Sequence, residues 1–170
     1  MAKREIGELQ RVFGTRLEAL EHLLDIGERH AGDEGFLQQR LAEDMLPFAA
    51  QVAFACNAPR GFAQWCAGEP IDNLKPERIT SLAEARAAIA QARAMVAGIT
   101  ADDAKLEEIK RVGLGPGRYC ELPARQYVAD YVLPNLYFHI TAAYAILRHL
   151  GAPLGKSDYM RWLAPYVRTE

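Results

Sequence analysis

Apolar residues recur at three- and four-residue steps through the first thirty positions, and charged residues fill the intervals. The apolar set comprises Ile6, Leu9, Phe13, Leu17, Leu20 and Leu24. This spacing places all of them on one face of a helix. We therefore predict an amphipathic helix over residues 5–30. It should end near Gly32, because glycine readily adopts the left-handed conformation that closes many helices.

A second apolar pattern follows the polar segment that begins at Asp44. Asp44 is a good N-cap residue, and Pro47 would be tolerated in the first helical turn. We predict a helix from Asp44 that runs on toward Trp65, with Pro59 kinking or interrupting it. Its inward face should carry Phe48, Val52, Ala55 and Cys56.

The middle of the chain predicts one more helix and then a change of structure. Ser81 precedes Glu84 by three residues, the spacing of a capping box, and an alanine-rich segment continues to Gly98. The polar residues 100–108 fit either a further helical turn or a loop. Residues 109–122 place a GLGPG turn between short apolar and aromatic runs, which predicts a small β-hairpin.

The most apolar run of the chain, residues 132–155, belongs to a long last helix. We predict that this helix covers residues 124–150 after Pro123, that Pro134 lies inside it and bends it, and that Gly151 ends it. Asn135 and His139 are four residues apart and should share one face. The C-terminal tail should pack its aromatic side chains back on the helices.

Length and composition favour a single all-α domain over residues 1–170, with four long helices around a central cleft. The formal net charge is -2, so the chain lacks the basic excess that nucleic acids attract. Three cysteines at spacings unlike zinc or redox motifs suggest reduced thiols. No segment resembles a signal peptide or a membrane span, and we expect a cytoplasmic protein without a nucleic-acid or membrane partner.

His139 is the main candidate for chemistry. Burying a histidine on an apolar helix costs about 1–3 kcal/mol unless it finds a polar partner. Asn135, Asp44 and Gln51 are the available groups. A satisfied structural histidine and a metal-ligating or catalytic histidine are equally good interpretations. The aromatic residues nearby, Tyr144 among them, should line the core and the cleft, whereas His22, His30 and His149 should be solvated at helix surfaces or ends.

Two stretches, DMLPFAAQV at 44–52 and LPNLYFHITAAYAILRHLGAPLGK at 133–156, resemble a bacterial family of uncharacterised proteins. That family is a domain of unknown function within the DinB/YfiT-like superfamily of predicted metalloenzymes. The resemblance implies an up-down-down-up four-helix bundle with a small β-hairpin before the last long helix. Metal-binding members carry three histidines, one on the second helix and a His-x-x-x-His pair on the fourth. By resemblance, His139 matches the second histidine of that pair, Asn135 replaces the first, and Gln51 is the nearest polar residue on the second helix.

Three functional hypotheses follow. The first is a bundle protein with a degraded metal triad that binds a small molecule through Asn135, His139, Gln51 and Tyr144. The second is a metal-dependent transferase or hydrolase, similar to thiol transferases, with a zinc or nickel ion, His139 as metal ligand or general base, and Asp44 as an assisting carboxylate. The third is a structural or interaction role as a homodimer. Whether the protein is an enzyme is left open by the sequence.

Overall fold

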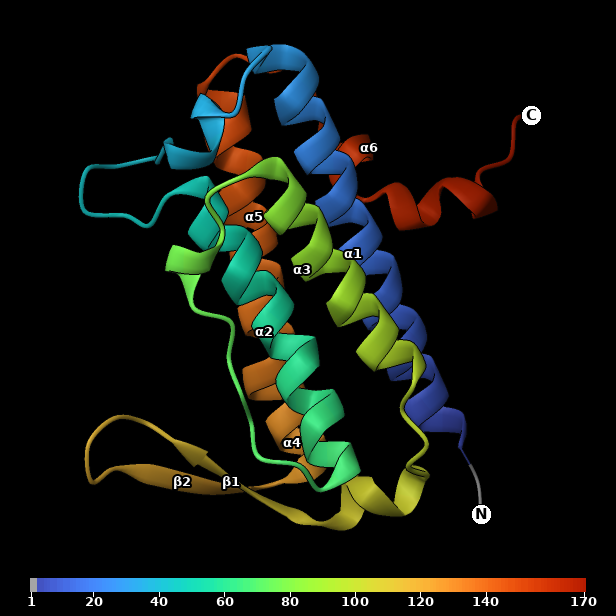
Figure 1. Cartoon of the computed structure of the whole chain (residues 1–170). Coiled ribbons are helices and arrows are strands. Elements are labelled where there is room, and N and C mark those ends of the chain that lie inside the picture. The colour runs from blue at the N-terminus through green and yellow to red at the C-terminus, as the bar shows by residue number, and fades with distance from the viewer. Residues whose placement is uncertain (1–2) are drawn as a thin grey trace.

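The computed structural model describes residues 3–170. It is mostly helical with one two-stranded antiparallel sheet, as predicted (Figure 1). The helices are α1 (Arg4–Ala31), α2 (Phe48–Ala67), α3 (Leu82–Ala97), α4 (Ala124–Tyr127), α5 (Leu133–His149) and α6 (Lys156–Tyr159). The strands are β1 (Ile109–Gly113) and β2 (Tyr119–Pro123).

The long helices pack side by side around one hydrophobic core. α2 contacts α3 and α5, and α1 contacts the same two helices from the other side. In Figure 1, α1 and α5 run upward while α2 and α3 run downward. The largest fully buried side chains of this core include Phe13, Phe48 and Phe62. In the part of the chain that is described, no helix combines the length and apolar character needed to cross a membrane.

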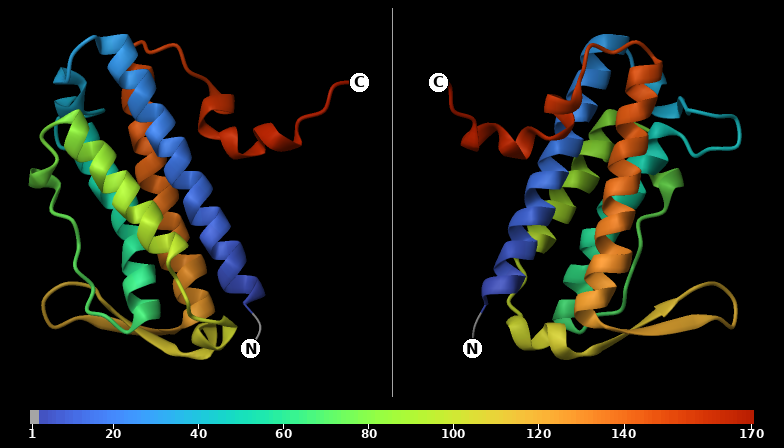
Figure 2. Two further views of the ribbon diagram at one scale, coloured as in Figure 1. Left: turned by 45° about the vertical axis from the view of Figure 1, so that its right-hand side comes forward. Right: turned by 180° about the vertical axis from the view of Figure 1, so that it is seen from behind.

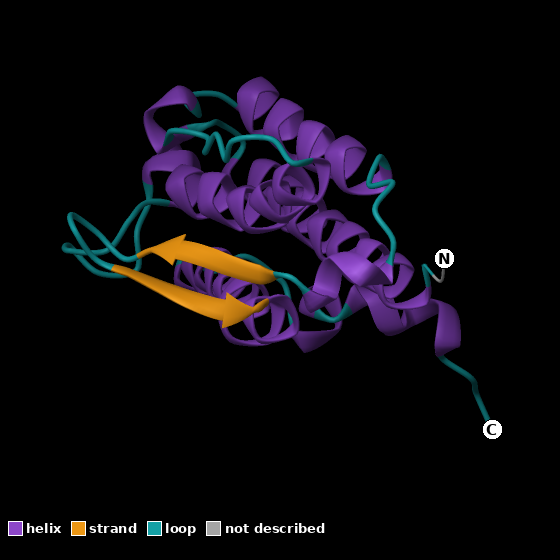
Figure 3. Ribbon diagram, turned by 90° about the horizontal axis from the view of Figure 1, so that it is seen from below, coloured by secondary structure: helices purple, strands orange, loops and turns teal. Residues whose placement is uncertain are grey.

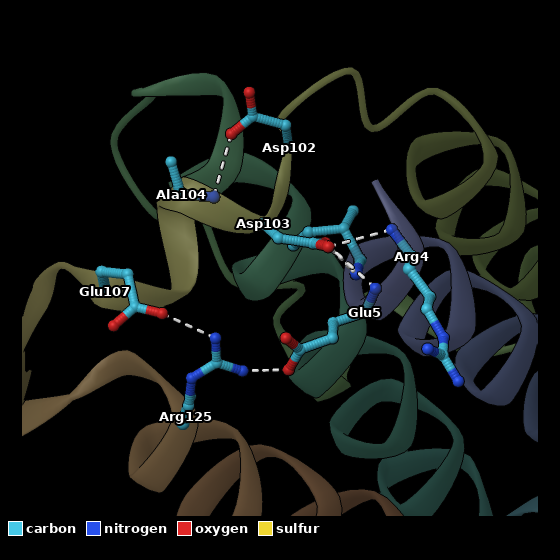
Figure 4. A network of polar contacts seen from close by, with 8 residues as sticks. Arg4, Glu5, Asp102, Asp103, Ala104, Glu107 and Arg125 are labelled. Atoms are coloured by element: carbon cyan, nitrogen blue, oxygen red, sulfur yellow. Dashed lines mark hydrogen bonds and ion pairs between the residues drawn. The ribbon is translucent and has the colours of Figure 1, made fainter. Parts of the chain in front are cut away.

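Each end of α1 is closed by a different device. At its C-terminus, Gly32 adopts φ 73°, the left-handed conformation expected from the sequence. At its N-terminus, the carboxylate of Asp103 accepts hydrogen bonds from the backbone N–H groups of Arg4, Glu5 and Ile6 at 2.9, 3.0 and 2.9 Å (Figure 4). Asp103 begins a 3₁₀ helix, Asp103–Glu107, so the polar segment at 100–108 forms a short helical turn that caps a distant helix.

The predicted start of α2 at Asp44 is wrong. The helix begins at Phe48, after Pro47 in an extended conformation that caps it without a side-chain hydrogen bond. The residue before a proline is pushed out of the helical region, so Leu46 cannot continue a helix from Asp44 into Pro47. Asp44 instead lies exposed in a turn. Pro59 does not interrupt α2, which runs through it to Ala67.

The last long helix is continuous but changes its winding before Pro134. Between α4 and α5, Val128–Val132 forms a π-helical turn, in which the N–H of Leu133 donates to the carbonyl of Val128. Pro134 then lies in the first turn of α5, directly after the π-helical turn, and both features are known sites at which a continuous helix accommodates a change of winding. The prediction that Pro134 lies within one continuous helical segment is confirmed.

The predicted start of α3 and the predicted hairpin are both present. Ser81 and Glu84 form the predicted capping box at the start of α3. β1 pairs antiparallel with β2, and the turn between them contains Gly115 at φ 108° and Gly117 at φ 70°. The hairpin lies at the lower end of the bundle and extends to one side (Figure 3).

The C-terminal segment packs on the bundle only in part. The guanidinium of Arg16 lies 4.0 Å from the ring centroid of Trp162, and Tyr159 stacks edge-on against Tyr144. Farther along, the chain projects away from the helices, and Tyr166 is 66% exposed (Figure 2).

His22, which we expected to be solvated, instead binds the start of the C-terminal segment. The Nε2 of His22 lies 2.9 Å from a carboxylate oxygen of Asp158 in α6. This pair, together with the contact between Arg16 and Trp162, holds the start of the C-terminal segment against α1.

Candidate functional site

A cavity of about 580 Å³ lies between α2, α5 and the hairpin, and His139 lines it. We call it the His139 cavity. Its other walls come from the π-helical turn and from the loop between α2 and α3. The residues that line it include Phe54, Asn57, Tyr127, Tyr131, Asn135 and, from β1, Lys110 and Arg111.

A chain of hydrogen bonds fixes the orientation of His139. The side-chain amide of Gln51, only 2% exposed, donates from Nε2 to the carbonyl of Leu46 at 3.1 Å. Because that carbonyl can only accept, the oxygen of the Gln51 amide must face His139, whose Nδ1 lies 2.8 Å away. Nδ1 therefore carries the proton, and Nε2 carries the lone pair.

The surroundings of His139 keep its ring neutral. Phe54 stacks on the imidazole with ring centroids 5.2 Å apart, and Phe138 meets it edge-on at 5.1 Å. Burial lowers the pKa of His139 to about 4, because a buried cation loses hydration that nothing here replaces. At neutral pH the side chain is thus a hydrogen-bond acceptor at Nε2, and Nε2 has no hydrogen-bond partner within residues 3–170.

Asn135 shares the cavity with His139, as its four-residue spacing predicts. Its Nδ2 donates to the carbonyl of Tyr131 at 2.6 Å, which leaves the amide oxygen for other partners. Tyr131 also stacks on Tyr127, with ring centroids 5.6 Å apart, and both rings border the cavity.

Two other residues selected from the sequence lie elsewhere. Tyr144 packs against Tyr159 of the C-terminal segment and does not line the cavity. Asp44 is exposed in the turn before α2 and is also absent from the lining. The structure therefore brings together Asn135, His139 and Gln51 but neither Tyr144 nor Asp44.

Three polar side chains on α2 hold the loop that forms one wall of the cavity. Asn57 donates to the carbonyl of Leu74 at 3.0 Å and accepts from its N–H at 2.7 Å. Gln64 accepts from the N–H of Asp72 at 3.2 Å. Arg60, only 6% exposed, donates to the carbonyl of Asp72 in the loop at 3.5 Å and to Gln91 of α3 at 2.7 Å. The sequence analysis missed these residues, although three polar positions at helical spacing on an apolar helix were a usable signal.

The hairpin supplies the cationic wall. The Nζ of Lys110 lies 5.8 Å from the ring centroid of Trp65 and 5.9 Å from that of Tyr127. Burial, and then the neighbouring charge of Lys105, lower the pKa of Lys110. Arg111 instead stacks its guanidinium on Tyr119 at 3.6 Å. None of the residues that line the cavity is an aspartate or glutamate.

A wider depression of about 730 Å³ lies beside the N-terminal turn of α1. Most of its charged groups are already paired, because Arg125 binds both Glu5 and Glu107, Glu8 binds Arg11 and Asp103 caps α1 (Figure 4). The side chains of the Arg125 pairs are exposed, whereas His139 is half-buried and its ring is oriented by the buried Gln51. We therefore take the His139 cavity as the candidate site despite its smaller volume.

Comparison with solved structures places the chain among DinB-like helical proteins. The crystal structure of a DinB family member protein from Shewanella denitrificans is similar to it, with a TM-score of 0.75 and 29% sequence identity over 91% of this chain and 93% of that one. Residues 9–160 match the domain of unknown function DUF1993, and the chain belongs to that family. No curated protein matches it. The resemblance inferred from the two sequence stretches is therefore confirmed.

The metal centre that the superfamily implies does not fit the residues present. Residues 3–170 contain no group of three or more His, Cys, Asp or Glu side chains placed to hold a metal ion. Around His139 the remaining donors are the carboxamides of Gln51 and Asn135, and the Gln51 oxygen already accepts the Nδ1 proton. Neutral amide oxygens are poor ligands for zinc or nickel, so we derive no metal-dependent step.

Proposed function

We propose that this chain binds a small organic molecule in the His139 cavity. The observation that carries the proposal is the unpartnered Nε2 of His139, whose lone pair is oriented by Gln51 and Leu46. An acceptor that faces a cavity in this way gains about 0.5–1.5 kcal/mol from a donor brought by a ligand. We further infer that α1, α2, α3 and α5 form the up-down-down-up bundle of the superfamily.

The size and chemistry of the cavity support this proposal. A volume of about 580 Å³ lies within the range of small-molecule pockets. Its aromatic walls at Phe54, Tyr127 and Tyr131 would bury an apolar body, and Asn135 and His139 would orient a polar group on it. Such a division between apolar walls and a few polar groups is typical of ligand sites.

The test is a fragment screen by two-dimensional NMR on the full chain. Molecules that bind should shift the backbone amide signals of Phe54, Asn135 and His139. His139→Ala should then weaken their binding about threefold to tenfold. His149→Ala is the matched control, because His149 is exposed at the other end of α5. The proposal fails if the bound fragments shift other surfaces, or if His139→Ala leaves every dissociation constant unchanged.

A further inference from the structure

Lys110 is a cation of the His139 cavity that has neither a counter-charge nor a close aromatic partner among the described residues. Lys105 is paired with Glu108 at 2.8 Å. Arg111 forms no ion pair with a described residue, but its guanidinium stacks on the ring of Tyr119 at 3.6 Å. Lys110, by contrast, makes no hydrogen bond or ion pair with any residue described, although it is half-buried above Trp65 and Tyr127.

The position of Lys110 carries an energetic cost that an anion would offset. Its ammonium group is partly removed from water, and the charge of Lys105 acts on it unfavourably. The faces of Trp65 and Tyr127 attract it only weakly at nearly 6 Å. With no carboxylate in the cavity lining, the partner that is missing is a negative charge from outside the chain.

From this arrangement we infer that the ligand of the His139 cavity is a small organic monoanion, a carboxylate attached to an aromatic or aliphatic body. The carboxylate pairs with Lys110 at the hairpin wall. The apolar body lies along Phe54 and Tyr127, and a hydroxyl or N–H group of the ligand donates to Nε2 of His139. This inference rests on the proposed function, because it assigns a ligand class to the same cavity.

A single charge is favoured over a phosphate group. Phosphate sites commonly combine several donors, such as bidentate arginines or the N–H groups of a helix N-terminus. Among the described residues that line the cavity, Arg111 forms no ion pair either, but its guanidinium lies on the ring of Tyr119 at 3.6 Å, which leaves the ammonium group of Lys110 as the cation without a close partner. One ammonium group matches one carboxylate in charge.

The experiment compares matched acids and amides on the intact chain. The pairs are benzoate and benzamide, 3-phenylpropionate and 3-phenylpropanamide, indole-3-acetate and indole-3-acetamide, and octanoate and octanamide, with inorganic phosphate as a separate arm. Dissociation constants come from NMR titration of the cavity amide signals. A hydrogen bond to a charged group contributes about 1.5–3 kcal/mol, so the best acid should bind at least about tenfold more tightly than its amide.

Lys110→Met should reduce that preference to about one while the amide still binds. Lys156→Met, which removes the same charge from exposed α6, should preserve it. Three results would each overturn the inference and leave the proposed function standing. They are amides that bind as tightly as the acids, an unchanged preference for acids in Lys110→Met, and phosphate that binds more tightly than every acid. If no member of any pair shifts the cavity signals, both are overturned.

Discussion

A fall in pH should destabilise this protein through the titration of His139 before the carboxylates of the protein begin to titrate. The imidazole is half-buried and contacts Phe54 and Phe138, and its partial burial lowers its pKa from the ordinary 6.5 to about 4. Above pH 7 the side chain is neutral in both the folded and the unfolded chain. Between pH 6.5 and 4, the unfolded chain takes up a proton that the folded protein excludes, so the free energy of unfolding falls as the pH falls.

The size of this effect follows from the two pKa values. The full shift would lower the free energy of unfolding by about 2 kcal/mol between pH 7 and pH 5. His139 lines a cavity that is open to solvent, and screening by water reduces such contributions. We therefore expect a loss of about 1 kcal/mol that is specific to His139.

Urea unfolding, followed by circular dichroism at about pH 7, 6 and 5, would measure this loss. His139→Gln removes the titrating group and keeps a polar side chain that can still bond to Gln51. This variant should lose about 1 kcal/mol less than the wild type over the same interval. His149→Gln, at an exposed position, should follow the wild type. Parallel pH profiles for wild type and His139→Gln would show that the imidazole is not protected from protonation.

Further expected outcomes concern two glycines of α1, the loop at 72–74 and metal binding. Gly27→Ala would place a methyl group 2.5 Å from the ring of Phe36 and should lower the free energy of unfolding by about 1–3 kcal/mol. Gly14→Ala has open space around the new methyl group and should raise the free energy of unfolding by about 0.5–1 kcal/mol. Urea unfolding measures both changes. Asn57→Ala should speed amide hydrogen exchange in the loop at 72–74, which loses two hydrogen bonds, and unchanged exchange would contradict that role. Untagged protein dialysed against a mild chelator should retain far less than one equivalent of zinc or nickel by elemental analysis. Asn135→His should raise metal binding, because it completes an i, i+4 histidine pair. Stoichiometric metal in the dialysed wild type would contradict the conclusion that the residues around His139 are poor metal ligands.

Features governed by neighbouring residues could be predicted from the sequence. The capping box of Ser81 and Glu84, the left-handed Gly32 and the hairpin turn all depend on contacts within a few positions. The pairing of His139 with Gln51 was also accessible, because a buried imidazole requires a polar partner and few were available on the facing helix.

The errors and omissions arose where a local preference competed with another constraint or a distant contact. Asp44 has the chemistry of an N-cap, but Pro47 moves the start of the helix past it. Tyr144 lies on the helix that carries His139, yet it packs on Tyr159 because the C-terminal segment returns to that side. The cationic wall at Lys110 depends on where the hairpin docks, which local patterns do not specify.

The cap that Asp103 places on α1 has a consequence for the order of folding. The first N–H groups of α1 are satisfied by a carboxylate from a turn that is synthesised almost a hundred residues later. Until that turn arrives, the start of α1 can satisfy these groups only with water and should fray. We therefore expect the first turn of α1 in a nascent chain to become ordered only after residues 103–107 have emerged and docked, so that the start of this helix is among the last parts of the bundle to be completed.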